Sequence, residues 1–369
     1  MSDNVNLEEM MVSIIQRIAT GPHLSKDINQ DEARLGMKAI LEDATDPVRA
    51  GIFLIALRMK RETDEEFRGV LQAILDATHR VIADVDEVLD IADPYDGYNR
   101  CIPSSPFLAP LMAECGVPAV SHGLDSVGPK YGITHRHVFT AAGVNVDVSP
   151  ADAAKRIADD SIGWSYVDQA QFVPQLHDMI DLRKKMIKRS AITTVEVLAK
   201  PIVGRNKTHF MTGYVHKPYP PIYAMLARHA GFDSAMIVRG IEGGITPSLR
   251  QASKYFAYHD KGEEKTIDIN PGALGIGEHE SRAVAIPADV PQTAKGEGAI
   301  TLTDVAKGAE KAAELGMAAL QGEKGATYDS LVYMGAMALD HLGKVKDIAE
   351  GSNQVRAVLD SGKAAARVK

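Results

Sequence analysis

A polar, glycine-rich turn is the first place where residue types in this sequence suggest ligand chemistry. It runs from Ser121 to Gly132 (SHGLDSVGPKYG), between the apolar residues 117–120 and a predicted helix. Glycines let the backbone approach a ligand closely, and main-chain N–H groups at a helix start favour an anion. A solvated turn with a purely structural histidine explains the same residues, so both interpretations stay open. The candidate ligand- and phosphate-binding residues of the turn are His122, Gly123, Ser126 and Lys130.

A second candidate site is a concentration of positive charge between Arg183 and Lys207. This stretch holds eight Lys and Arg residues and one acidic residue, Glu196, in a chain of net charge −8. Residues 174–190 predict a helix, on which positions 185, 188 and 189 share a face by their i, i+3, i+4 spacing. Such a face predicts contact with phosphate or nucleic acid, although a solvated surface is the simpler alternative. The basic patch comprises Lys184, Lys185 and Lys188, with Arg183 and Arg189 as candidate phosphate ligands.

Four helices are predicted in the first 80 residues. Apolar residues recur at helical spacing over 8–18 and 30–41. Asp46-Pro47 supplies an N-cap and a first-turn proline for a helix that reaches Met59. Thr63 to Glu66 is a capping-box pattern that opens a helix through Leu75. These helices predict a packing scaffold more than a site of chemistry.

From Val85 onward the pattern changes to short apolar strands that alternate with helices, which is typical of parallel β-α-β units. Ligands bind beyond the carboxyl ends of such strands. The predicted strands are 89–92, 117–120 and 235–238, and the turns that follow them, at 93–94, 121–123 and 239–240, are the first places to look for a site.

Composition excludes several classes of protein. With 369 residues, 45% hydrophobic and 24% charged, the chain is long enough for two domains with a buried core, at about 100–200 residues each. No apolar stretch approaches the ~20 residues of a membrane span, so we expect no membrane partner. Two cysteines, Cys101 and Cys115, cannot build a disulfide framework, which favours a cytoplasmic location. Walker A, HExxH, CxxC and GxSxG sequences are missing.

Several features along the chain together resemble one known family. They are the helical stretch 53–63, the HG…SV…K.G turn at 122–132, Pro174 with Arg183 and Arg189, and the closing segments 328–329 and 361–364. In these features the chain resembles the anthranilate phosphoribosyltransferases. The turn is similar to the family's phosphoribosyl-diphosphate turn, and Arg183 corresponds to the arginine that contacts anthranilate.

The resemblance implies a fold and an assembly. The fold is α/β with an all-helical N-terminal domain, a phosphoribosyltransferase/nucleoside phosphorylase-like fold with a mainly parallel central sheet. The helical domain comprises residues 1–82, joined by inserted helices near 172–192, and the α/β domain comprises 83–171 and 193–369. Since the family's helical domain usually makes a homodimer, we expect one here.

The chain departs from the family where the diphosphate and its metal bind. Asp93-Pro-Tyr-Asp-Gly97 stands in place of the family's GTGGD loop. Side-chain bulk and negative charge there repel a diphosphate by Coulombic terms of about 1–4 kcal/mol. The family's KHGNR becomes Ser121-His-Gly-Leu-Asp125, and of its Asp-Glu magnesium pair only Glu242 remains as a weak candidate.

Two hypotheses follow. The first is an anthranilate phosphoribosyltransferase-like paralogue without the family activity, which binds phosphate-rich partners such as nucleic acid through the basic residues. The second is an active glycosyltransferase that joins phosphoribosyl diphosphate to anthranilate or a related aromatic acceptor, as in tryptophan biosynthesis. It requires Mg²⁺, and His122, Lys130, Arg183 and Glu242 have to replace the lost groups. A purely structural or regulatory dimer is a third alternative.

Overall fold

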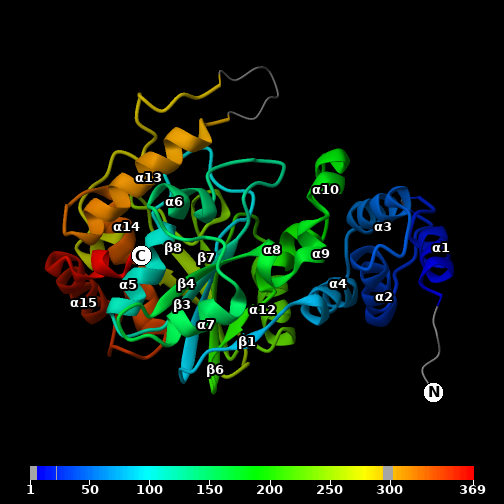
Figure 1. Ribbon diagram of the computed structural model, residues 1–369, viewed down its shortest axis with the longest axis horizontal. Coiled ribbons are helices and arrows are strands. Elements are labelled where there is room, and N and C mark those ends of the chain that lie inside the picture. The colour runs from blue at the N-terminus through cyan, green and yellow to red at the C-terminus, as the bar shows by residue number, and fades with distance from the viewer. Residues whose placement is uncertain (1–5, 22, 294–301) are drawn as a thin grey trace.

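The computed structural model describes residues 6–21, 23–293 and 302–369 of the chain (Figure 1). The N-terminal helices lie at one end of the molecule, and a mixed sheet flanked by helices forms the rest. No helix within these residues combines the length and the apolar character needed to cross a membrane. The architecture confirms the predicted α/β fold with a helical N-terminal domain.

The N-terminal helices begin where the sequence supplies side-chain caps. Thr63 accepts a hydrogen bond from the Glu66 N–H, and the Glu66 carboxylate accepts one from the Thr63 N–H at 2.9 Å, which completes a capping box. Asp46 caps the preceding helix, whose first residue is Pro47. The four predicted helices are confirmed as α1 (Leu7–Ile18), α2 (Gln30–Leu41), α3 (Pro47–Lys60) and α4 (Asp64–Ala77).

The central sheet has seven strands in the order β4-β3-β2-β6-β7-β8-β9. The first five of these run parallel to one another, β8 pairs antiparallel with β7, and β9 pairs antiparallel with β8. A separate small sheet pairs β1 with β5. The strands are β1 (Val81–Ile82), β2 (Glu87–Ala92), β3 (Ala119–Gly123), β4 (Trp164–Asp168), β5 (Ile202–Val203), β6 (Lys207–Tyr214), β7 (Ser234–Arg239), β8 (Ser253–Tyr258) and β9 (Lys265–Ile269).

The three strands predicted from sequence correspond to β2, β3 and β7, with one shift. Strand β3 begins two residues later than predicted and continues through Gly123. His122 and Gly123 therefore belong to a fully buried strand, and the turn starts after them. Because side chains of a strand alternate between its two faces, this shift decides what His122 can contact.

Helices cover both faces of the sheet (Figure 1). The helices after α4 are α5 (Leu108–Glu114), α6 (His135–Ala141), α7 (Pro150–Ala158), α8 (Gln169–Phe172), α9 (Pro174–His177), α10 (Ile180–Met186), α11 (Ile192–Val195), α12 (Tyr219–His229), α13 (Val305–Leu320), α14 (Ala326–His341) and α15 (Ile348–Ser361), with short 3₁₀ turns between some of them. Of these, α10 lies beside α3 and α11 beside α4 instead. Alternate residues of β2 enter two hydrophobic cores. Val88 and Ala92 join the core shared with the N-terminal helices, while Leu89 and Ile91 join the core beneath α5, α13, α14 and α15.

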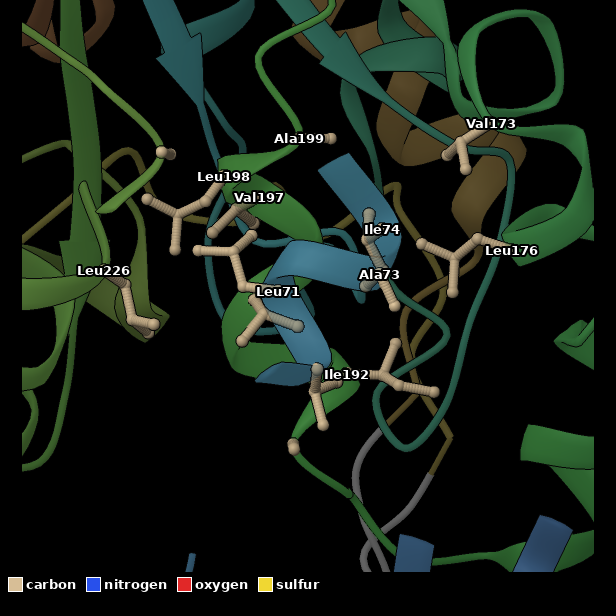
Figure 2. Close-up of a cluster of buried hydrophobic side chains, with 14 of the residues drawn as sticks. Leu71, Ala73, Ile74, Val173, Leu176, Ile192, Val197, Leu198, Ala199 and Leu226 are labelled. Atoms are coloured by element: carbon tan, nitrogen blue, oxygen red, sulfur yellow. The ribbon is translucent and has the colours of Figure 1, made fainter. Parts of the chain in front are cut away.

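Helix α4 anchors the N-terminal helices to the sheet domain. Figure 2 shows Leu71, Ala73 and Ile74 of α4 surrounded by apolar side chains from residues 173–199 and from α12. These contacts are fully desolvated, and burial of a Leu or Ile side chain stabilises by about 1.5–3 kcal/mol. The segment that carries the basic residues is thus held against the helical end of the molecule. The side chains in contact with α4 include Val173, Leu176, Ile192, Val197, Leu198 and Leu226.

The predicted continuous helix over 174–190 is wrong. The chain forms α9 and α10 instead, and α10 ends at Met186 because Ile187 adopts a left-handed conformation, with φ 63°. Lys188 and Arg189 lie beyond this end, so they do not share a helical face with Lys185. The turn at Ile187 directs Arg189 toward the loop after β2, as described below.

Candidate functional site

The loop after β2 is organised around a buried carboxylate, that of Asp93. It accepts hydrogen bonds from the Tyr98 hydroxyl at 2.6 Å, from His135 Nε2 at 2.9 Å and from the Ile245 N–H at 3.0 Å. The Ser105 hydroxyl donates to the same carboxylate. Burial raises the pKa of the Asp93 carboxyl, but the hydrogen bonds from these donors outweigh it and hold that pKa below its usual value. Asp93 thereby joins the turns that follow β2 and β7.

A second buried chain of hydrogen bonds lies below the same loop. His122 Nε2 bonds to Asp90 Oδ1 at 2.7 Å, and His122 Nδ1 bonds to the Tyr95 hydroxyl. Burial above all, with the nearby carboxylates, raises the pKa of Tyr95 well above its ordinary value. Both ring nitrogens of His122 are thus engaged within the protein, and the histidine supports Tyr95 from beneath.

A cleft opens at the carboxyl edge of the sheet, above this network. Tyr95 and Asp96 form one wall, Lys130 and Arg189 a second, and the end of β6 from Thr212 to His216 a third. The first turn of α12 and the turn after β7 complete it. The cleft therefore lies where parallel-sheet proteins bind ligands. Gly123 is buried in β3 and Ser126 is half-buried in the next turn, so neither of these two candidates is among the residues that line it.

An ion triplet occupies one side of the cleft. Asp96 Oδ1 is 3.0 Å from Lys130 Nζ, and Asp96 Oδ2 is 2.5 Å from Arg189 Nη2. The Asp96 side chain is only 5% exposed. The structure thus brings together two of the candidate phosphate-binding residues, but around a carboxylate of the protein itself.

Glu242 has a structural contact set. Its carboxylate accepts hydrogen bonds from the Asn99 N–H at 3.1 Å and the Arg100 N–H at 2.6 Å, and the Cys101 thiol lies 3.6 Å away. Lys130 Nζ donates to the Glu242 main-chain oxygen at 3.1 Å. Burial, aided by the Glu242 charge, raises the pKa of Cys101 well above its ordinary value, which favours the neutral thiol over the nucleophilic thiolate.

These contacts do not fit a magnesium site. Mg²⁺ takes near-octahedral oxygen ligands, usually from carboxylates together with substrate phosphates. The Glu242 oxygens already serve backbone donors. Across the part of the chain that the structure describes, no three His, Cys, Asp or Glu side chains converge as metal ligands would.

Arg183 forms a bidentate ion pair with Glu196. Both N–H···O distances are 2.7 Å, and both side chains are buried. Gln169 Nε2 donates to the same carboxylate at 3.2 Å. The charge of Arg183 is therefore balanced inside the protein, whereas the sequence alone left it as a candidate phosphate ligand.

Most other cations of the segment 183–207 are also neutralised close by. Arg205 pairs with Asp86 at 2.9 Å, and Lys207 with Asp260 at 3.4 Å. Lys200 is buried, and that burial lowers its pKa to about 8. The anomaly in charge that the sequence displays is therefore smaller in the folded protein.

A basic surface remains on the outer side of α10. Lys184 and Lys188 are exposed and form no ion pair with another described residue, while Lys185 pairs with Asp181 at 2.6 Å. Tyr131 and Arg189 line the same pocket as Lys184 and Lys188. We call these four residues, Tyr131, Lys184, Lys188 and Arg189, the outer basic face.

Sequence reasoning missed Tyr131. It is 37% exposed and adopts φ 46°, a left-handed conformation that presents its ring beside the lysines. An aromatic residue next to Lys130 within a glycine-flanked turn was the available signal.

A mainly parallel sheet with a cleft at its carboxyl edge, beside a helical bundle, defines an α/β protein with a helical N-terminal domain. The helical bundle domain of the glycosyl transferase family matches residues 12–78, and the a/b domain of that family matches residues 96–365. The chain therefore belongs to the glycosyl transferase family.

Relatives place the chain more narrowly, beside the anthranilate phosphoribosyltransferases, and confirm the predicted resemblance. An anthranilate phosphoribosyltransferase of Rhodopseudomonas palustris is 27% identical over 97% of this chain and 96% of its own length. An uncharacterized protein of Aquifex aeolicus is 32% identical over 60% of this chain and 65% of its own. The fold matches anthranilate phosphoribosyltransferase of Saccharomyces cerevisiae in complex with PRPP and Mg, with a TM-score of 0.77 and 18% identity over 98% of this chain and 97% of that one.

We predict that the Arg183–Glu196 pair serves stability. Glu196→Gln leaves a buried guanidinium without its counter-charge, which should lower the free energy of unfolding by about 3–5 kcal/mol. Urea denaturation followed by circular dichroism measures the loss. Asp181→Asn removes a carboxylate of an exposed pair and should leave the urea midpoint nearly unchanged. Equal midpoints for Glu196→Gln and the unmodified protein would contradict the prediction.

Proposed function

We propose that this chain is a family member that has lost phosphoribosyl transfer and binds nucleic acid through its outer basic face. The observation that carries the proposal is the distribution of ion pairs. Asp96 pairs with both Lys130 and Arg189 in the cleft. Lys184 and Lys188, in contrast, are exposed with no carboxylate partner in the described ranges.

Two features of the cleft support the loss of phosphoribosyl transfer. Departure of diphosphate builds negative charge that donors and a metal normally neutralise. Here the two nearest cations already contact Asp96, and the Glu242 oxygens are taken by backbone N–H groups. Since the Asp96 charge also opposes an incoming diphosphate, these features together favour a chain without the family activity.

The outer basic face has the composition of a surface that binds single strands. Phosphates contact Lys and Arg through charge, and bases stack on aromatic rings with little sequence preference. Lys184 and Lys188 supply cations without a carboxylate partner among the described residues, and Tyr131 supplies a partly exposed ring in the same pocket. We therefore propose single-stranded nucleic acid as the partner class.

We predict that a fluorescent single-stranded oligonucleotide binds at low salt. The double variant Lys184→Glu/Lys188→Glu should bind more weakly, and the slope of log K against log salt should fall by about 1.4, since each lost phosphate contact removes about 0.7. Fluorescence anisotropy over a salt series measures both. Lys346→Glu/Lys363→Glu makes the same charge change at exposed positions flanking α15 and should retain the original slope.

Tyr131→Asn separates stacking from charge within the same experiment. Asparagine tolerates the left-handed backbone of this position but offers no ring. We expect a loss of about 1–3 kcal/mol in binding with an unchanged salt slope. Absence of oligonucleotide binding at low salt would refute the proposed function.

An active transferase is the second candidate, favoured by the full-length similarity to proteins named anthranilate phosphoribosyltransferase. Under the proposal above, incubation with phosphoribosyl diphosphate, Mg²⁺ and anthranilate should leave anthranilate fluorescence unchanged. An authentic anthranilate phosphoribosyltransferase assayed in parallel provides the positive control. Turnover that is lost in Lys130→Ala would establish the transferase instead.

We also propose a homodimer through the helical domain. Val48, Ile52 and Met59 of α3 are 68%, 40% and 77% exposed, and their spacing places them along one side of the helix. An exposed apolar stripe of this kind is typical of an interaction surface.

Sedimentation velocity tests this assembly. The unmodified chain should sediment as a dimer, and Ile52→Glu/Met59→Glu should sediment as a folded monomer because carboxylates would be desolvated at the contact. Leu24→Glu changes an equally exposed apolar residue outside α3 and should remain dimeric. A monomer in the unmodified protein would rule the dimer out.

A further inference from the structure

We infer that Asp96 is an internal substitute for a ligand: its carboxylate fills an anion-binding site between Lys130 and Arg189, which would otherwise accept a phosphate-type anion. The two oxygens of Asp96 are divided between the two cations, at 3.0 Å and 2.5 Å. A bridging anion from solution would place its oxygens in the same way. The carboxylate is 5% exposed, so it lies inside the cleft wall and does not fold back from the surface.

The surroundings of Asp96 contain more donors than one carboxylate requires. Arg58 lines the same cleft, where its guanidinium donates to the Tyr219 hydroxyl at 3.3 Å and lies 3.7 Å from the buried Glu62 carboxylate. Ser190, Thr193 and Thr194 add hydroxyl groups to the wall beside Arg189. A site with two cations that share one carboxylate, and with several hydroxyls beside them, suits a multiply charged oxyanion better than a single carboxylate.

Negative charge from the protein is limited to two groups among the residues that line this cleft. Asp96 faces the cations directly, while the Glu242 carboxylate is turned toward the N–H groups of Asn99 and Arg100. Removing the charge of Asp96 therefore makes the local charge balance more positive, because Lys130 and Arg189 then have no counter-ion within contact distance among the described residues.

The geometry also explains how Asp96 keeps its place. The Gly97 N–H donates to the Pro94 carbonyl at 3.0 Å, and the Gly132 N–H donates to the Asp96 carbonyl at 2.9 Å. A Cβ at Gly97 would lie 2.5 Å from the Gly132 backbone, so the two turns pack in direct contact. The backbone thus holds the Asp96 carboxylate next to Lys130, where it occupies the place of an incoming anion.

The inference concerns a different site from the proposed nucleic-acid function. Lys184 and Lys188 do not line the cleft, so oligonucleotide binding and anion binding can fail independently. Arg189 lines both and is left unchanged in the variants below.

Isothermal titration with inorganic pyrophosphate at low ionic strength tests the inference on the full chain. Asp96→Asn keeps the shape of the side chain and removes its charge, so pyrophosphate should bind at least about tenfold more tightly than to the unmodified protein, the factor that about 1.4 kcal/mol of relieved repulsion provides. Asp181→Asn removes an equal charge from an exposed pair on α10 and should bind like the unmodified protein. Asp96→Asn/Lys130→Gln should lose the gain.

Three results would overturn the inference. The first is a folded Asp96→Asn variant that binds pyrophosphate no better than the unmodified chain. The second is tight pyrophosphate binding by the unmodified chain itself. The third is loss of cooperative thermal unfolding in both Asp96→Asn and Asp96→Ser, since Asp96 would then hold the fold and not fill a ligand site; a folded Asp96→Ser is expected to behave like Asp96→Asn.

Discussion

A carboxylate removed from water has to be met by donors or cations, and this requirement shapes the loop after β2. Three aspartates within seven residues, Asp90, Asp93 and Asp96, are all buried. Each has its own set of partners: a histidine for Asp90, a group of hydroxyl, imidazole and N–H donors for Asp93, and two cations for Asp96. The partners outside this loop come from β3 and the segment that runs from it to the first residue of α6, from the turn after β7, and from the segment after α10. The buried carboxylates of this segment therefore hold three separate parts of the chain together beside the cleft.

Because of these internal ion pairs, the cations near the cleft fall into two groups. Cations inside the cleft or the core, such as Arg183 and Lys130, are matched by carboxylates and serve the architecture. Lys184 and Lys188 remain on the outside, next to an aromatic ring. Charge that is matched internally gives little binding energy to a partner, because a new ion pair with that partner would have to break an internal one. Lys184 and Lys188, the two lysines without a carboxylate partner among the described residues, supply only two charges. Such a small number suits a partner that offers a long row of phosphates rather than a single one.

Local patterns in the sequence were sufficient for much of the fold. The capping box at Thr63, the proline after Asp46 and the apolar run of β2 determine their elements through nearby residues, and they were predicted close to their observed bounds. The helix over 174–190 was not, because Ile187 turns left-handed where Arg189 reaches Asp96, a partner 93 residues away. Strand β6 carries the polar residue His209, which finds its hydrogen-bond partner Ser234 only in the folded sheet, and this hides the strand pattern. Candidate site residues were recognised by their type, but their role depends on which ion pairs they form. The ion pair of Arg183 with Glu196 depends on the turn between α10 and α11, which the sequence pattern did not predict.

The apolar contacts around α4 join the helical end of the molecule to the sheet through one continuous core, which includes Leu71 and Ile74 on one side and Phe210 and Ile237 on the other. Swinging the bundle away from the sheet would expose these side chains to water, at about 1.5–3 kcal/mol for each large one. The same core therefore opposes any wider opening of the cleft. A molecule that enters finds its upper size set by side chains buried well away from the cleft itself.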